Sequence, residues 1–270
     1  MVRNLIRRMN LFQGQEEGPK YRLALDIGTE YVKAIYIEMD GTNSKVIGVG
    51  RARQDYADME NGAVASISGV TCCCRQAITQ GSIVAGVKPT EVVIGLAGQF
   101  VHGIARTIEK QRIKPDRPIT LPELEMFVKE AQKEALKDVM ESIIQKLNYP
   151  KMDIELVHSS LVSITIDGYP VTNPLDFHGR NLELTIFMTF APLVHASAMR
   201  TIAGRLGLDL LGLVAEPYAV ASSSLTDEAY EFGSLVIDIG GGSTDIALIQ
   251  KRGITGVKMM AMGGRAFTKG

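Results

Sequence analysis

Apolar and polar residues alternate in short runs along most of the chain, and turn-forming residues separate the runs. Alternation with a period of two is typical of strands, whereas apolar residues three and four apart are typical of helices. These patterns predict successive strands within 21–54 and helices at 66–83, 120–148, 191–206 and 217–225. They predict further strands at 91–97, 154–166, 181–190, 209–215 and 234–239. The interleaved strands and helices after residue 190 favour an α/β layered domain.

The longest predicted helix begins at Thr120, because Thr120 and Glu123 have the spacing of a capping box. Asn148 and Pro150 end it. Its Lys- and Glu-rich face is expected to be solvated and to carry ion pairs four residues apart. Its apolar residues are Leu124, Phe127, Val128, Ala131, Ala135, Val139, Ile143 and Leu147.

Two segments that lie far apart in the chain resemble each other. LALDIGTEYVKAIYI at 23–37 aligns without gaps with LVIDIGGGSTDIALI at 235–249, and five of the fifteen positions are identical. Each copy is an apolar strand that runs into Asp-Ile-Gly, then a turn, then a second apolar strand. The repeat therefore predicts two hairpins, each with an aspartate at the end of its first strand.

The second copy has the composition of an anion site. Three consecutive glycines let backbone N–H groups point into one concavity, and the hydroxyls that follow add donors. Asp238 would repel phosphate directly, so it is assigned to a hydrated Mg²⁺, which takes one or two carboxylates together with phosphates. A flexible hairpin tip is the alternative interpretation. The residues assigned to phosphate are Gly240, Gly241, Gly242, Ser243 and Thr244.

The first copy has the same logic with fewer glycines. Asp26 is assigned to the metal, Gly28 to close backbone approach and Thr29 to a hydroxyl contact with phosphate. Lys33 either reaches a phosphate as a point charge or lies solvated on its strand. No GxxxxGK[ST] motif occurs, so this is not a P-loop. Two such hairpins facing each other would clamp the phosphates and metal of a nucleotide.

Composition narrows the classes of function. The 270 residues are 46% hydrophobic, enough for a real core, and the net charge of −1 provides no basic field for nucleic acid. The three cysteines are consecutive, which excludes a disulfide framework. No apolar run is long enough to span a bilayer, and the N-terminus lacks a secretory signal. We therefore expect a cytoplasmic protein.

The paired hairpins resemble the two phosphate loops of the ATPase superfamily of actin, sugar kinases and heat-shock chaperones. Glu216-Pro217 resembles the connecting motif of that superfamily, and Gly263-Gly264 with Phe267 resembles the segment after the second loop. The resemblance implies ATP and Mg²⁺ as ligands. It also implies a catalytic role for Glu216, which would position the attacking water. A first-turn acid favoured by the helix dipole is the alternative for Glu216.

Within the superfamily, FtsA-like division proteins are most similar, and PilM-like pilus assembly proteins are close behind. GLAGQFVHG at 95–103 and ITIDGYPVTNPLDFHGRNLEL at 164–184 resemble the two ends of their inserted subdomain. The implied fold is an α/β actin-like (ribonuclease-H-like) ATPase fold with an inserted small α+β (SHS2-type) subdomain and an incomplete second lobe. The expected units are an N-terminal extension at 1–20, a first lobe at 21–100 and 185–228, the insertion at 101–184, and the start of the second lobe at 229–270.

The resemblance implies an ATP-binding adaptor, at most a weak ATPase, that links a tubulin-like division polymer to the membrane. A PilM-like protein with a pilus partner is one alternative, and a sugar kinase or phosphatase on the same scaffold is another. Self-association through 101–184 and peripheral contact with the inner face of the cell membrane are also expected. For the membrane contact, residues 1–15 carry three arginines and no acid beside an apolar helical face, although a disordered leader is the alternative.

Two features depart from the family pattern. Glu30 stands where relatives place a small residue or a hydroxyl, and its carboxylate is expected to weaken phosphate binding. The sequence stops at Gly270, before the adenosine-binding motif and the C-terminal membrane helix of FtsA-like proteins. We therefore expect weak nucleotide binding with little preference for adenine over guanine, and essentially no turnover. We also expect exposed apolar strand edges near 235–239 and 246–249, which would favour aggregation or pairing with another chain.

Overall fold

The computed structural model describes residues 20–40, 43–60, 62–98, 101–147, 153–250 and 253–268, and over 142–147 it describes the backbone alone. The basic segment at 1–15 lies outside the described residues, so its predicted membrane contact stays a prediction.

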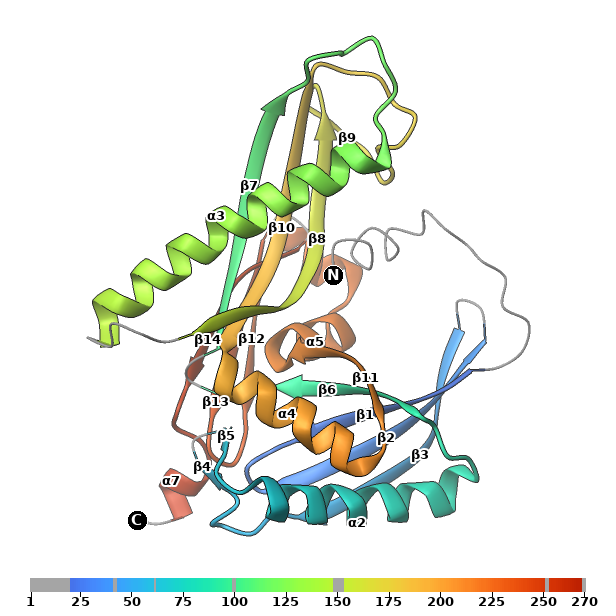
Figure 1. Cartoon of the computed structure of the whole chain (residues 1–270), viewed down its shortest axis with the longest axis vertical. Coiled ribbons are helices and arrows are strands. Elements are labelled where there is room, and N and C mark those ends of the chain that lie inside the picture. Colours follow the sequence, from blue (N-terminus) through green and yellow to red (C-terminus); the bar gives the residue numbers. More distant parts are fainter. Residues whose placement is uncertain are drawn as a thin grey trace.

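A five-stranded sheet forms the base of the molecule (Figure 1). Strands β1 (Lys20–Ile27), β2 (Tyr31–Asp40) and β3 (Asn43–Arg53) are antiparallel neighbours. On the other side of β1 follow β6 (Glu91–Leu96) and β11 (Asp209–Ala215), which run parallel to it. This mixture of hairpins and parallel crossovers confirms the predicted α/β layering.

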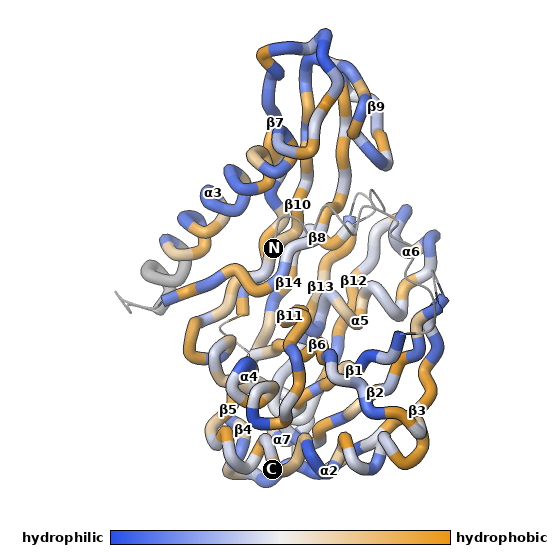
Figure 2. Tube along the Cα trace, turned by 45° about the vertical axis from the view of Figure 1, so that its right-hand side comes forward, coloured by the Kyte–Doolittle hydropathy of each residue, from blue (hydrophilic) through white to orange (hydrophobic). Residues whose placement is uncertain are grey.

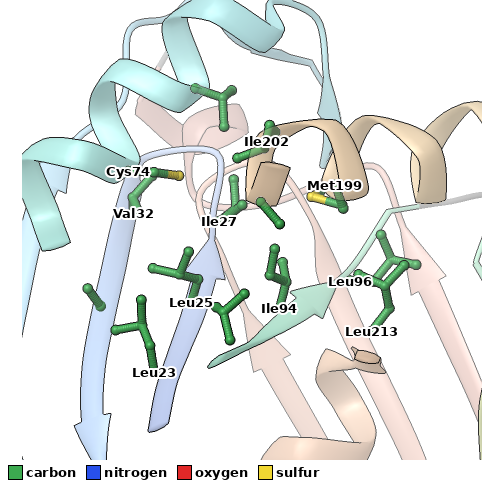
Figure 3. Close-up of a cluster of buried hydrophobic side chains, with 14 of the residues drawn as sticks. Leu23, Leu25, Ile27, Val32, Cys74, Ile94, Leu96, Met199, Ile202 and Leu213 are labelled. Atoms are coloured by element: carbon green, nitrogen blue, oxygen red, sulfur yellow. The ribbon is translucent and has the colours of Figure 1, made fainter. Parts of the chain in front are cut away.

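Helices α2 (Ile67–Ala85) and α4 (Leu193–Leu206) cover one face of this sheet. Alternate residues of β1, such as Leu25, point into a core that Cys74 of α2 and Met199 of α4 complete (Figure 3). Gly50 of β3 lets α2 approach closely, because a Cβ there would overlap the carbonyl of Ala77.

A second sheet runs along the length of the molecule, and its seven strands are antiparallel throughout. In spatial order they are β12 (Ser234–Ile239), β13 (Thr244–Gln250), β14 (Gly253–Met260), β7 (His102–Gln111), β10 (Asn181–Pro192), β8 (Ile154–Ile166) and β9 (Tyr169–Pro170). The tube view shows β7, β8 and β10 projecting beyond the rest of the molecule (Figure 2). Strand β14 meets β7 through Gly256 opposite Ile104 and Val257 opposite Gly103. Strands of the predicted units 101–184 and 229–270 therefore share one sheet, while the unit boundaries themselves stay predictions.

Helix α3 (Leu121–Leu147) lies against the projecting strands and has a hydrophobic core of its own with them (Figure 1). Its acidic residues pair with basic residues of β7 and the segment after it: Glu134 and Asp138 with Arg106, Glu130 with Lys110, and Glu123 with Arg112. These pairs join two elements, whereas the sequence predicted pairs along the helix. The Glu123 carboxylate of the predicted capping box accepts from Arg112 instead.

The remaining elements are short. They are β4 (Met59–Glu60), β5 (Ala63–Val64), α5 (Glu216–Ser224), α6 (Asp227–Phe232) and α7 (Arg265–Thr268). Helix α5 packs against β12, β13 and β14, and it shares a third small core with them. Over the described part of the chain, no helix is both long enough and apolar enough to cross a bilayer.

One face of β12 is exposed and apolar. Leu235, Ile237 and Ile239 are 58%, 52% and 66% exposed, while Ile249 of the neighbouring strand is fully buried. The expected exposed strand edge is therefore present at 235–239, because β12 is the outer strand of its sheet. It is absent at 246–249, because β13 pairs with both β12 and β14 and Ile249 packs against α5.

Candidate functional site

The first hairpin joins β1 to β2 through a tight turn. The Gly28 amide donates to the Tyr31 carbonyl at 3.1 Å, and a Cβ on Gly28 would lie 2.9 Å from that carbonyl oxygen. The turn sets Asp26 opposite Lys33, and the Lys33 Nζ donates to the Asp26 Oδ2 at 2.8 Å. This hydrogen bond raises the pKa of Lys33. Lys33 is therefore paired with Asp26, the residue that the sequence assigns to the metal.

The second hairpin joins β12 to β13 in the same way. The Gly240 amide donates to the Ser243 carbonyl at 2.9 Å, and Asp238 lies opposite Asp245. Asp245 is only 3% exposed, and its Oδ1 has no hydrogen-bond partner within the described residues. Burial raises the pKa of Asp245 to about 7, and the charge of Asp238 contributes. An orphaned, buried carboxyl oxygen is the kind of group that a bound cation would satisfy.

The two hairpins differ at one decisive position. In the repeat alignment Lys33 corresponds to Asp245, so the partner of the first aspartate is a cation and the partner of the second is another acid. Like charges on directly opposite residues are unfavourable. The second hairpin therefore has an excess of negative charge that a cation would relieve. The sequence reasoning did not assign Asp245 to the site, although the alignment of the repeats contained the signal.

Glu216 is the first residue of α5, and its carboxyl lies against Gly95 of β6. The residue keeps a partly exposed surface, yet protein atoms crowd its carboxyl, and this burial raises the pKa of Glu216 well above its ordinary value. The carboxylates of Asp26, Asp245 and Asp238 raise this pKa further. Glu216 is a first-turn acid, as one interpretation had it, and it also lies within electrostatic reach of both hairpins.

The tips of the two hairpin loops are in close contact. A Cβ on Gly242 would lie 2.9 Å from the Thr29 hydroxyl oxygen, and one on Gly241 would lie 3.0 Å from the Cβ of Glu30. Within the described residues, no backbone carbonyl accepts from the amides of Gly241 and Gly242. These glycines therefore let the loops meet, and they leave amides available for an anion.

Thr244 and the Gly-Gly segment complete the second loop. The Thr244 hydroxyl donates to the Met262 carbonyl at 2.6 Å, so its proton is already used within the protein. The Gly264 amide donates to the Gly240 carbonyl at 2.8 Å, and the Arg265 amide donates to the Gly241 carbonyl at 2.9 Å. The segment after β14 is thus hydrogen-bonded to the second loop.

Among the residues that the structure describes, no three side chains of His, Cys, Asp or Glu come close enough together to hold a metal ion alone. Asp26 and Asp238, the predicted metal residues, belong to opposite hairpins. A Mg²⁺ ion that takes only one or two carboxylates, with water and phosphate as its other ligands, is compatible with this arrangement.

The chain is similar to known proteins over most of its length. It is 25% identical to the cell division protein FtsA of Bacillus subtilis (strain 168) over 251 residues, and 26% identical to FtsA of Streptococcus pneumoniae (serotype 2, strain D39) over 249 residues. These matches cover 92% and 91% of this chain but 53% and 50% of the two proteins. The chain therefore spans about half the length of the curated relatives it matches. Residues 188–270 match the MreB/Mbl protein family.

Solved structures extend the comparison to the fold. The chain is similar to a chain of the PilM-PilN type IV pilus biogenesis complex, with a TM-score of 0.60 and 17% identity, over 92% of this chain and 63% of that one. Such a likeness is one of fold alone. Together with the sequence matches, it confirms two expectations: this is an FtsA-like chain, and its fold is the actin-like ATPase fold.

Proposed function

Because the chain is FtsA-like and has the actin-like fold, we propose that the site between the two hairpins binds ATP with Mg²⁺. The observation that carries the proposal is the group of acids around one lysine, beside glycine amides that have no backbone acceptor. Acids alone would repel phosphates. Acids next to amide donors suit a ligand that combines a divalent cation with phosphate oxygens.

The residues of the proposed site divide between the cation and the phosphates. Asp26 and Asp238 would hold the cation through its water shell, and the cation would relieve the repulsion between Asp238 and Asp245 on the opposite strand. The amides of Gly241 and Gly242 would bind phosphate oxygens, and Lys33 would offer its charge from beside Asp26. Mg²⁺ would neutralise part of the phosphate charge.

The remaining assigned residues surround this centre. Gly28 and Gly240 close the two turns through their own amides. The Thr29 hydroxyl lies where the loops meet, whereas the Ser243 hydroxyl lies close to Gly62. Thr244 binds Met262 and so supports the loop. Glu216 would position a water for any hydrolysis, because its raised pKa and its electrostatic contact with acids of both hairpins suit a group that exchanges a proton near the phosphates.

Calorimetric titration of the chain with ATP in Mg²⁺ tests the site. We expect Asp238→Ala and Gly241→Val to weaken binding at least about tenfold, since each removes a charge-assisted contact or fills the space where the loops meet. Matched controls are Asp209→Ala, an exposed aspartate of β11, and Gly204→Val, where an added side chain meets open space. Unchanged affinity in both site variants would remove the site assignment.

At the level of the cell, we propose that the protein acts in division as an adaptor between a tubulin-like division polymer and the membrane. The sequence similarity to FtsA proteins over nine-tenths of the chain supports this role, whereas the similarity to the PilM complex is one of fold. A fluorescent fusion of the protein in its own host is expected at the division site, together with the tubulin-like polymer. Localisation with pilus machinery instead would favour the PilM-like alternative.

Two further parts of the proposal concern contacts. The projecting unit at 101–184 has its own core and would provide self-association. The basic segment at 1–15 would provide peripheral membrane contact. Sedimentation with anionic vesicles, with and without residues 1–15, tests the second, and equal pelleting of the two chains would exclude it.

A further inference from the structure

Arg265 contacts both loops of the site. Its backbone amide donates to the Gly241 carbonyl of the second loop. Its side chain reaches across to the first loop, where Nε donates to Glu30 Oε2 and Nη2 donates to the Thr29 carbonyl, both at 2.8 Å. The side chain is only 16% exposed, and its guanidinium lies 4.1 Å over the Tyr56 ring. Packing and hydrogen bonds thus hold this arginine in one position.

Glu30 is the acceptor around which this contact is built. Its second carboxylate oxygen pairs with Arg53 at 3.2 Å, so two arginines share one acid. Its backbone carbonyl accepts a hydrogen bond from the backbone amide of Gln54 at 2.9 Å, which ties the loop to the end of β3. Glu30 and Arg265 are 235 positions apart in the sequence, so the ion pair links the first hairpin loop to the segment after β14.

The ion pair with Arg265 accounts for Glu30, a residue whose place beside the phosphate loops the sequence left unexplained. A carboxylate beside the phosphate loops is expected to repel a phosphate, yet here it is paired with an arginine that lies between the same loops. A phosphate oxygen and the Glu30 carboxylate are both anionic acceptors for a guanidinium, and Arg265 has geometry suited to either. An incoming phosphate therefore meets a donor that is already occupied.

We propose that Glu30 and Arg265 form a clasp, which holds the two loop tips together in the ligand-free chain and which an entering phosphate opens by competing with Glu30 for Arg265. The competition rests on the proposed nucleotide site, whereas the clasp itself does not. Glu30 sets the affinity for phosphate by occupying the arginine, and Arg265 is the group for which the two anions compete.

The clasp is tested first without ligand, by hydrogen exchange at the two loop tips, 27–31 and 239–244. Glu30→Gln and Arg265→Gln are each expected to speed exchange there about threefold to tenfold, because each breaks a partly buried, hydrogen-bonded ion pair. The control is Glu91→Gln, which breaks the ion pair of Glu91 with Arg22 at 3.1 Å, away from the loops, and it is expected to leave their exchange unchanged. If neither loop variant changes the rate of hydrogen exchange at the loop tips, the clasp is refuted.

The competition is tested by titrating the same variants with ATP in Mg²⁺ and with tripolyphosphate. Glu30→Gln is expected to tighten binding about threefold to tenfold and Arg265→Gln to weaken it, although both variants loosen the loops. A purely structural role would weaken binding in both variants, and that result would overturn the competition. If the unmodified chain binds neither ligand, the proposed nucleotide site fails, and the exchange measurement still decides the clasp.

Discussion

Replacing Asp245 by Asn is expected to stabilise the ligand-free chain at neutral and alkaline pH. The ordinary pKa of an aspartate is 3.8, and burial beside Asp238 raises that of Asp245 to about 7. Between these values the folded chain holds a proton that the unfolded chain has released. The free energy of unfolding therefore falls as the pH rises through this window.

The size of the effect follows from the shift. One pKa unit corresponds to about 1.4 kcal/mol, so a shift of about three units destabilises the folded chain by about 4 kcal/mol once Asp245 is ionised. Because the side chain is 3% exposed, solvent gives little relief. Asparagine has nearly the same shape and carries no charge. The variant and the unmodified chain should thus be similarly stable near pH 4 and differ most above pH 7.

Urea unfolding at a series of pH values from 4 to 8, with a chelator present, measures this difference. Circular dichroism is a suitable signal because the chain has no tryptophan. Because the Asp245 carboxylate also raises the pKa of Glu216, the difference between the two proteins measures Asp245 together with its interaction with Glu216. The control is Asp209→Asn on the exposed part of β11. A difference between Asp245→Asn and the unmodified chain that does not change with pH would refute the reasoning.

Two further outcomes follow from packing and exposure. Gly50→Ala is expected to lower the free energy of unfolding by about 2 kcal/mol, because its Cβ would overlap the Ala77 carbonyl of α2. The control is Gly212→Ala, whose Cβ meets open space and should be tolerated, and thermal unfolding compares the two variants. Ile237→Lys, on the exposed apolar face of β12, is expected to reduce aggregation in sedimentation velocity, and unchanged aggregation would show that this face is not responsible.

The sequence by itself determined most of the elements. The strands predicted at 154–166, 209–215 and 234–239 have the same bounds in the structure, and the others differ by a few residues. Periodicity and turn residues are local signals, and each of these strands carries them in full. The repeat likewise identified both hairpins, because Asp-Ile-Gly within two apolar strands is written in each copy. Strands β7 and β14 were missed, and the segment of β14 lacks a clear alternation.

Only the tertiary structure decided how these parts act on one another. Asp245 looks like Asp238 in the sequence, and its burial beside that second acid is what raises its pKa. Glu30 reads as a poor neighbour for phosphate until Arg265, 235 positions away, is seen to hold it. The acids of α3 read as pairs along a helix, and they cross to β7 and Arg112 instead. Hydrogen-bonded turns and side-chain periodicity depend on neighbours in the chain, whereas burial and ion pairing depend on neighbours in space, which the fold alone brings together.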